Sequence, residues 1–214
     1  MDVSGYDHLH LSLEAEGRLL VLTLDHGKAN EMGSAQLREF ERLTALLEGG
    51  TAVALISFSK RRSRRGTPIF IAGANVTERA DWNETQVKDH VRWQRRVLRE
   101  LRSAPVFHIG VVGGVALGWG TEYLLTCDYR IAADEAVFGL PETGLGILPG
   151  AGGTSELWAH IGVAQALRLG MTGERIDADE AMRLGLVQER RTDIDACLAR
   201  ARELAGRAAK CSPT

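Results

Sequence analysis

The sequence is poor in cysteine, which excludes small proteins that depend on disulfide bonds. Only three of its 214 residues are cysteines. Their number is odd, they lie far apart and they form no C-x-x-C pair: they are Cys127, Cys197 and Cys211. This pattern predicts neither a disulfide framework nor a metal site. We therefore expect reduced thiols in a cytoplasmic protein without a metal site.

An excess of charge of one sign is also missing. The chain has 26 basic and 28 acidic residues, which leave a formal net charge of −2 when histidine is neutral. A nearly neutral chain has no overall field that could hold nucleic acid or an anionic membrane surface. We expect neither of these partners, and any anionic ligand must be bound locally.

No stretch of the sequence has the length and apolar character of a membrane span. The most apolar stretch, residues 104–120, contains His108 and several glycines, which favours a buried strand that leads into a turn. The acidic N-terminus lacks the basic start and apolar run of a signal peptide. We expect no secretory leader and no membrane helix.

The residues that are present predict one globular α/β domain over residues 1–214. The chain is 44% hydrophobic and 25% charged, and it is long enough to bury a core without disulfide bonds or a metal ion. Strand and helix patterns alternate without repeats or a linker, which favours crossover connections. The expected strands are 9–14, 18–24, 52–58, 106–112 and 129–133. The expected helices are 35–48, 84–102, 120–127, 153–170 with a break near Gly162, 178–184 and 193–209.

Three segments are rich in glycine without having the composition of surface loops. They read IFIAGANVTE over residues 69–78, GGVALGWGTE over 113–122 and FGLPETGLGILPGAGGT over 138–154. Glycine lets the main chain approach a ligand closely and adopt positive φ, so such segments can direct backbone N–H groups at a developing negative charge. None of them has the spacing of a phosphate-binding loop.

In their order and spacing these segments resemble the enoyl-CoA hydratase/isomerase (crotonase) family. The family patterns are F-x-A-G-A-D, G-x-A-x-G-G-G-x-E and F-x-x-P-E-x-x-x-G-x-x-P-G-x-G-G, and the third, matched from Phe138 to Gly153, is the most specific. The resemblance covers nearly the whole chain. It implies a ClpP/crotonase-like fold of stacked ββα units, with a sheet core flanked by helices.

The resemblance also implies how a substrate is activated. Family members bind an acyl thioester and stabilise the enolate that forms when its carbonyl takes up charge. By motif position, the backbone N–H groups of Ala74 and Trp119 form the oxyanion hole. Such a donor typically contributes about 10²–10³ in rate. Because the donor belongs to the main chain, Trp119 can replace the usual glycine without loss of the hydrogen bond.

Glu122 and Glu142 fall where the hydratases have their two catalytic carboxylates. Addition of water to a conjugated double bond needs one group that takes a proton from water and one that delivers a proton to the α-carbon, and glutamates do both when burial tunes their pKa. The sequence leaves open which glutamate does which. The alternative for each is a solvated or paired surface carboxylate.

Further contacts to the substrate or to CoA are implied at eight positions: Lys28, Ala29, Ala72, Gly73, Asn75, Val76, Gly118 and Gly150. Asn75 stands where aspartate is common in the family. Gly150 either helps to hold the reacting water or substrate, or is a turn glycine. The five cations within residues 60–65 either attract the CoA phosphates or form a solvated loop.

These observations favour an enoyl-CoA hydratase-like enzyme, a hydro-lyase whose coenzyme A enters as part of the substrate and which needs no resident cofactor. One alternative is a non-catalytic or accessory subunit of a biosynthetic complex. Another is an acyl-thioester isomerase, decarboxylase or hydrolase on the same fold. The sequence leaves open whether the acyl group is carried by CoA or by a carrier protein.

The sequence ends at Thr214, about where the last helices begin in family members. We therefore expect most of the C-terminal helical trimerisation region to be missing. This argues against the homo-oligomer, a trimer or hexamer, that the family commonly forms. It also predicts a less completely covered site, in which water weakens the electrostatic interactions.

Overall fold

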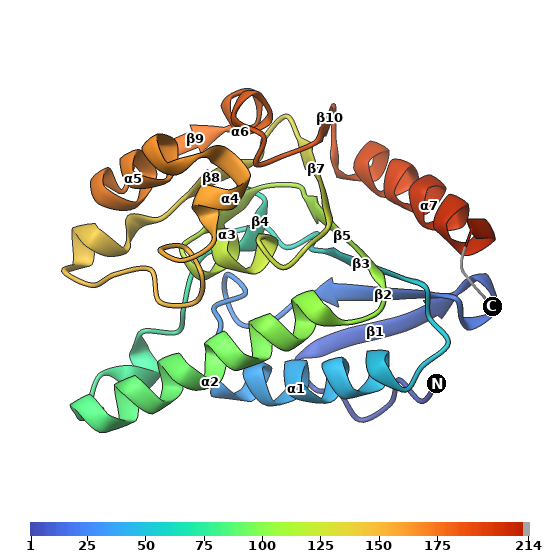
Figure 1. Cartoon of the computed structure of the whole chain (residues 1–214), viewed down its shortest axis with the longest axis horizontal. Coiled ribbons are helices and arrows are strands. Elements are labelled where there is room, and N and C mark those ends of the chain that lie inside the picture. The colour runs from blue at the N-terminus through green and yellow to red at the C-terminus, as the bar shows by residue number, and fades with distance from the viewer. Residues whose placement is uncertain (212–214) are drawn as a thin grey trace.

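The computed structural model describes residues 1–211, which form two β-sheets and the helices around them (Figure 1). The larger sheet contains, from edge to edge, β1 (Leu9–Glu14), β2 (Leu19–Leu24), β3 (Ala54–Phe58), β5 (Phe107–Val112), β7 (Tyr129–Ala133) and β10 (Glu189–Arg191). Only the hairpin β1–β2 is antiparallel within it, and every other neighbouring pair is parallel.

The smaller sheet consists of strands of three residues each. Its order is β4 (Ile69–Ile71), β6 (Val115–Leu117), β8 (Val137–Gly139) and β9 (Arg175–Asp177). The first three are parallel to one another, whereas β9 is antiparallel to β8. Each of these three follows a strand of the larger sheet along the chain, and β4 and β6 are followed in turn by a helix. This is the arrangement of stacked ββα units that the sequence predicts.

Seven α-helices accompany the sheets in the described residues: α1 (Ser34–Glu48), α2 (Glu84–Ser103), α3 (Trp119–Leu124), α4 (Leu157–Ile161), α5 (Val163–Thr172), α6 (Ala178–Leu184) and α7 (Ile194–Cys211). Three short 3₁₀ segments occupy residues 15–17, 77–79 and 141–145. In Figure 1, α1 and α2 run side by side and α7 lies apart from them, near β2 and β3. None of the helices in residues 1–211 is both long and apolar enough to span a membrane.

The helices cover opposite faces of the larger sheet because side chains of a strand alternate between its faces. On β2, Leu20 and Leu22 belong to the core that contains α1 and α2, whereas Leu19 and Val21 belong to the core beneath α7. Both faces of the parallel strands are therefore buried, which explains why they read as continuous apolar runs.

The prediction of a helix at 153–170 is wrong in its first part. Residues 151–156 form turns, α4 starts at Leu157, and Gly162, with φ +78°, separates α4 from α5. Glycines and the proline at 149 resist helix formation here, and two N–H groups of the turn bind a carboxylate instead. The helix expected at 120–127 also ends earlier, at Leu124, and the break near Gly162 is confirmed.

Candidate active site

Three neighbouring parallel strands bring the predicted hole and one carboxylate to the same edge of the smaller sheet. Ile71 of β4 pairs with Ala116 of β6, and the residues three positions further along each chain are Ala74 and Trp119. The next strand, β8, ends at Gly139, which pairs with Leu117 of β6, and Glu142 lies three positions after Gly139. Because carboxyl ends of parallel strands meet at one edge, the register itself gathers these residues.

The N–H of Ala74 is left free by the way its segment pairs. Met32 donates its N–H to the carbonyl of Gly73 at 3.0 Å and accepts the N–H of Asn75 at 2.7 Å. This parallel bridge uses the residues on either side of Ala74 and directs the Ala74 N–H to the other side of the strand. Within residues 1–211 that N–H makes no hydrogen bond to another backbone group.

The N–H of Trp119 also has no backbone partner in the described part of the chain, but for a different reason. Trp119 is the first residue of α3, and the first N–H groups of a helix have no acceptor within the helix. Its side chain is buried in the main core, where the indole stacks on Tyr123 with ring centroids 5.7 Å apart and also approaches Phe40. The large side chain is thus part of the core, while its main chain supplies the free donor.

Glycines with positive φ stand directly before both donors. Gly73 has φ +138° and Gly118 has φ +53°, values that side chains disfavour. At Gly118 space is also limiting, since a Cβ atom there would lie 2.6 Å from Oε1 of Glu142. The missing side chain therefore lets the Glu142 carboxylate lie against the backbone that leads into Trp119.

Glu122 is a buried carboxylate held by backbone donors. It lies one turn into α3, is only 2% exposed, and its Oε1 accepts the N–H groups of Ala151 at 2.7 Å and Gly153 at 2.9 Å. Burial raises the pKa of Glu122 to about 7, and the nearby charge of Glu142 raises it further, while the backbone donors oppose both effects. Near neutral pH this group can therefore both give and take a proton.

Glu142 is half-buried in the 3₁₀ segment Pro141–Leu145. Burial raises its pKa as well. Its Oε2 is buried and has no hydrogen-bond partner among the residues that the structure describes. The site thus contains two carboxyl groups with raised pKa values. Glu142 lies against the backbone at Gly118, and its charge acts on Glu122. Carboxyl groups with perturbed pKa values are typical of sites that carry out proton transfer.

The loop before α1 lies against the segment that carries the Ala74 donor. Ala72 donates its N–H to the carbonyl of Ala29 at 3.1 Å. A polar pocket of about 310 Å³ opens between the two segments and is lined by Lys28, Asn75 and Val76 among others. The structure therefore brings together the predicted CoA contacts at 28–29 and 72–76, beside the hole.

Sequence reasoning did not select Asn30 as a functional residue, although it holds this loop. Asn30 is fully buried with φ +55°, and its Nδ2 donates to the carbonyl of Phe70 at 2.7 Å and to Ser59 Oγ at 2.9 Å. It also donates to the carbonyl of Leu24. An asparagine followed by a change of chain direction is a signal for this conformation, because asparagine tolerates positive φ.

Gly150 is a predicted contact that does not line the polar pocket beside Ala74. A Cβ atom at Gly150 would lie 3.4 Å from Nε2 of Gln94, a buried residue of α2. Gly150 also directly precedes Ala151, which binds Glu122. The structure therefore places it on the Glu122 side of the site, whereas Lys28 and Ala29 are on the side of Ala74.

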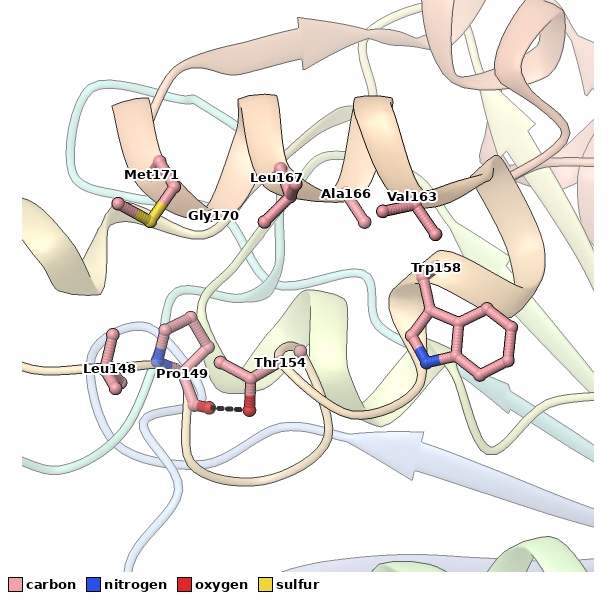
Figure 2. Close-up of a pocket in the computed structure, with 10 residues that line it drawn as sticks. Leu148, Pro149, Thr154, Trp158, Val163, Ala166, Leu167, Gly170 and Met171 are labelled. Atoms are coloured by element: carbon pink, nitrogen blue, oxygen red, sulfur yellow. Dashed lines mark hydrogen bonds between the residues drawn. The ribbon is translucent and has the colours of Figure 1, made fainter.

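An apolar groove adjoins the site and was not foreseen from the sequence (Figure 2). It has a volume of about 440 Å³ and lies between the loop around Pro149 and helices α4 and α5. Trp158, Leu167 and Met171 line it and are 53–68% exposed. The groove reaches the site at Gly153, which donates to Glu122, but neither carboxylate lines it.

Comparison with known proteins identifies the family. The sequence profile of the enoyl-CoA hydratase/isomerase family matches residues 64–214. A short-chain-enoyl-CoA hydratase of Clostridium acetobutylicum is 38% identical over 180 residues, which are 83% of this chain and 67% of the relative. A crotonyl-CoA hydratase of Syntrophomonas wolfei is 35% identical over 84% of this chain and 68% of its own length.

A solved structure supports the same conclusion. An enoyl-CoA hydratase from Bacillus anthracis superposes with a TM-score of 0.86 and 34% identity, covering 95% of this chain and 77% of that one. The chain spans 52–67% of the length of three of its curated relatives. The chain belongs to the enoyl-CoA hydratase/isomerase family, has the crotonase fold, and its relatives support an enoyl-CoA hydratase-like function.

Proposed function

We propose that this chain adds water to the double bond of a 2-enoyl-CoA, or removes it from a 3-hydroxyacyl-CoA. The observation that carries the proposal is the pair of carboxyl groups with raised pKa values, Glu122 and Glu142, beside two backbone donors that have no backbone partner within residues 1–211. In this site the thioester oxygen accepts the N–H groups of Ala74 and Trp119. Charge that develops on that oxygen is then stabilised without reorganisation of the protein.

The two glutamates divide the proton transfers. One is charged and takes a proton from water as the water oxygen bonds to the β-carbon of the enoyl group. The other is protonated and gives its proton to the α-carbon, so that the enolate returns to a neutral thioester. Their raised pKa values allow one charged and one neutral carboxyl group at neutral pH, which is the state the reaction needs.

The CoA portion of the substrate extends from the hole into the polar pocket beside Lys28. Asn75 and Val76 line that pocket next to Ala74, so a thioester held in the hole has its polar carrier directed there. The substrate is then an acyl-CoA, in keeping with the hydratases that the chain resembles, and no resident cofactor takes part. We place the reaction in the cytoplasm, in keeping with the unpaired cysteines among the described residues.

The proposal is tested by following the loss of the conjugated thioester absorbance of crotonyl-CoA. Glu122→Gln and Glu142→Gln remove one proton carrier each, and we expect kcat to fall by about 10²–10⁴ in either variant. Glu203→Gln is the control, because Glu203 is exposed on α7 and pairs with Arg200 and Arg207. A double Glu122→Gln, Glu142→Gln variant with full activity would refute the assignment.

The same assay separates hydration from double-bond migration. A site with one working carboxylate suffices for an isomerase, whereas hydration uses both. If either single variant retains the activity of the wild type on crotonyl-CoA, the remaining carboxylate acts alone and the hydratase proposal is wrong. Incubation with a 3-enoyl-CoA then identifies an isomerase by the appearance of conjugated thioester absorbance.

A further inference from the structure

Arg79 is a half-buried cation with an incomplete set of partners. It ends the 3₁₀ segment Thr77–Arg79, five residues after Ala74. Its Nη2 donates to Nε2 of His90 at 2.9 Å, and its Nε is buried without an acceptor among the residues that the structure describes. Among residues 1–211, no carboxylate lies within ion-pair distance of the Arg79 guanidinium, although arginine stays charged at any physiological pH.

The neighbours of Arg79 do not neutralise it. Burial and the charge of Arg79 lower the pKa of His90 to about 4, so His90 is a neutral acceptor at physiological pH. The imidazole is wedged between the rings of Trp82 and Trp93, with centroids 4.9 Å and 5.7 Å away. The guanidinium carbon itself lies 6.0 Å from the Trp82 ring. These contacts fix the arginine without supplying a negative charge.

The surroundings place Arg79 on the α2 side of the reacting centre. Gln94 lies one turn after His90 on α2, is buried, and approaches Gly150, which precedes the backbone that binds Glu122. The Gln94 Oε1 atom is buried and lacks a hydrogen bond within the described part of the chain. The polar pocket assigned to CoA extends to Thr77, and Arg79 does not line it.

Both acidic groups whose charges act on Arg79 are occupied elsewhere. Oε2 of Glu78 accepts the N–H of Ser34 at 2.9 Å, at the start of α1. Oε1 of Glu122 accepts two backbone N–H groups. A half-buried cation without a direct counter-ion is unfavourable unless it is paired, so the arrangement favours an anionic group brought by the ligand.

We propose that Arg79 binds a second acidic group of the substrate, a carboxylate at the far end of the acyl chain. The guanidinium matches a carboxylate in shape and can donate two parallel hydrogen bonds to it, whereas a fully apolar acyl tail leaves the cation unpaired. This inference rests on the proposed function, since it places the thioester in the hole and the acyl tail toward α2. It assigns the substrate to the class of 2-enoyl-CoA thioesters with a terminal carboxylate.

The inference is tested by binding of two saturated thioesters, which cannot be hydrated. Glutaryl-CoA and valeryl-CoA have five acyl carbons each and differ in the terminal carboxylate. Calorimetric titration of the wild type is expected to give a Kd for glutaryl-CoA about 10–100 times lower than for valeryl-CoA, as for a charge-assisted hydrogen bond. Arg79→Met is expected to remove or invert this preference, and Arg79→Lys to retain part of it.

Arg92→Met is the matched control, because Arg92 is an exposed arginine of α2 paired with Asp89; it is expected to keep the wild-type preference. Two results overturn the inference: a wild type that does not bind glutaryl-CoA more tightly than valeryl-CoA, and an Arg79→Met variant that weakens both thioesters equally, which indicates a contact to CoA. Should Arg79→Met fail to fold, the preference of the wild type for glutaryl-CoA and its reduction in Arg79→Lys still test the inference. Hydration of crotonyl-CoA tests the proposed function separately.

Discussion

Two opposing effects meet at the Glu122 carboxyl group. Burial favours its neutral form, whereas the N–H groups of Ala151 and Gly153 favour its charged form, and burial is the larger effect because the pKa rises to about 7. Had the backbone donors prevailed, Glu122 would be a permanently charged structural group. The balance instead leaves it able to exchange a proton near neutral pH.

Replacing Glu122 with glutamine is expected to alter how stability depends on pH. The folded chain binds the Glu122 proton more tightly than the unfolded chain, whose ordinary value is 4.5. This stabilisation is therefore complete below pH 4.5 and is lost as pH rises to about 7, an effect of about 3 kcal/mol at most. Urea unfolding at pH 5 and pH 8 should show the wild type losing stability relative to Glu122→Gln as pH rises.

Glu203→Gln provides the comparison for this measurement. Arg200 lowers the pKa of Glu203 on the surface of α7, so its contribution changes only at more acidic pH. Its stability relative to the wild type should be the same at pH 5 and pH 8. A wild type that gains stability over Glu122→Gln between these values would mean that Glu122 is held in its charged form.

At the scale of elements, the site depends on short strands and on the glycines that follow them. A three-residue strand has little stability of its own, but β4, β6 and β8 pair in parallel, with an irregularity between Ile69 and Ile71, and share one core with strands of the larger sheet. Gly118 then turns the chain from β6 into α3 with positive φ, beside Glu142. The Trp119 donor of the predicted oxyanion hole and the Glu142 carboxylate thus both lie beside Gly118.

We expect Gly118→Ala to damage both stability and catalysis. The new methyl group would lie 2.6 Å from Oε1 of Glu142 on a residue with φ +53°, so strain of about 1–3 kcal/mol is expected. The displaced carboxylate and the shifted Trp119 donor should lower kcat on crotonyl-CoA by about tenfold or more. Thermal unfolding and the hydration assay measure the two effects.

Gly206→Ala is the matched glycine variant. Gly206 is exposed within α7, and a Cβ atom there meets nothing within 4 Å. Alanine is a better helix former, so a gain of about 0.5–1 kcal/mol is expected, with unchanged kcat. If Gly118→Ala behaves like Gly206→Ala, the close approach of Glu142 to the backbone has no catalytic role.

The long elements were predictable from the sequence because they carry a clear hydrophobic period. Helix α2 was expected at 84–102 and occupies Glu84–Ser103, and its start is fixed locally by Asn83, whose side chain accepts the N–H of Gln86. The strands of the smaller sheet have three residues each, too few to show a period of two. The glycine-rich segments overlap β4, β6 and β8, but the sequence predicted none of these strands.

The candidate site was predictable where a motif fixed it and not where distant residues meet. The charge of Glu142 acts on Glu122, but their assignment as the catalytic pair remains a prediction from the family resemblance. Asn30 and Arg79 were not selected as site residues because the contacts that distinguish them involve partners far along the chain or on another element, such as Phe70 and His90, and burial. Residues 153–156 were predicted as helix but belong to a turn whose N–H groups bind Glu122.

On the scale of the whole molecule, α7 completes the second core and connects the two ends of the described chain. Its buried residues pack against β2, β3, β5 and β7, on the face opposite to the site. Arg202 of α7 also forms an ion pair with Glu14 at the end of β1. The candidate-site side of the sheet is therefore supported from behind by a helix that carries none of the predicted site residues.

Truncating the buried face of α7 should lower stability without altering the reacting groups. Leu198 is only 4% exposed in this core, and Leu198→Ala is expected to lower the free energy of unfolding by about 2–5 kcal/mol. Arg202→Ala removes only an exposed ion pair, worth about 1 kcal/mol or less. Urea unfolding measures both losses, and kcat on crotonyl-CoA per folded molecule should stay at the wild-type level. A large fall in kcat for Leu198→Ala would show that the second core positions Glu122 or the hole directly.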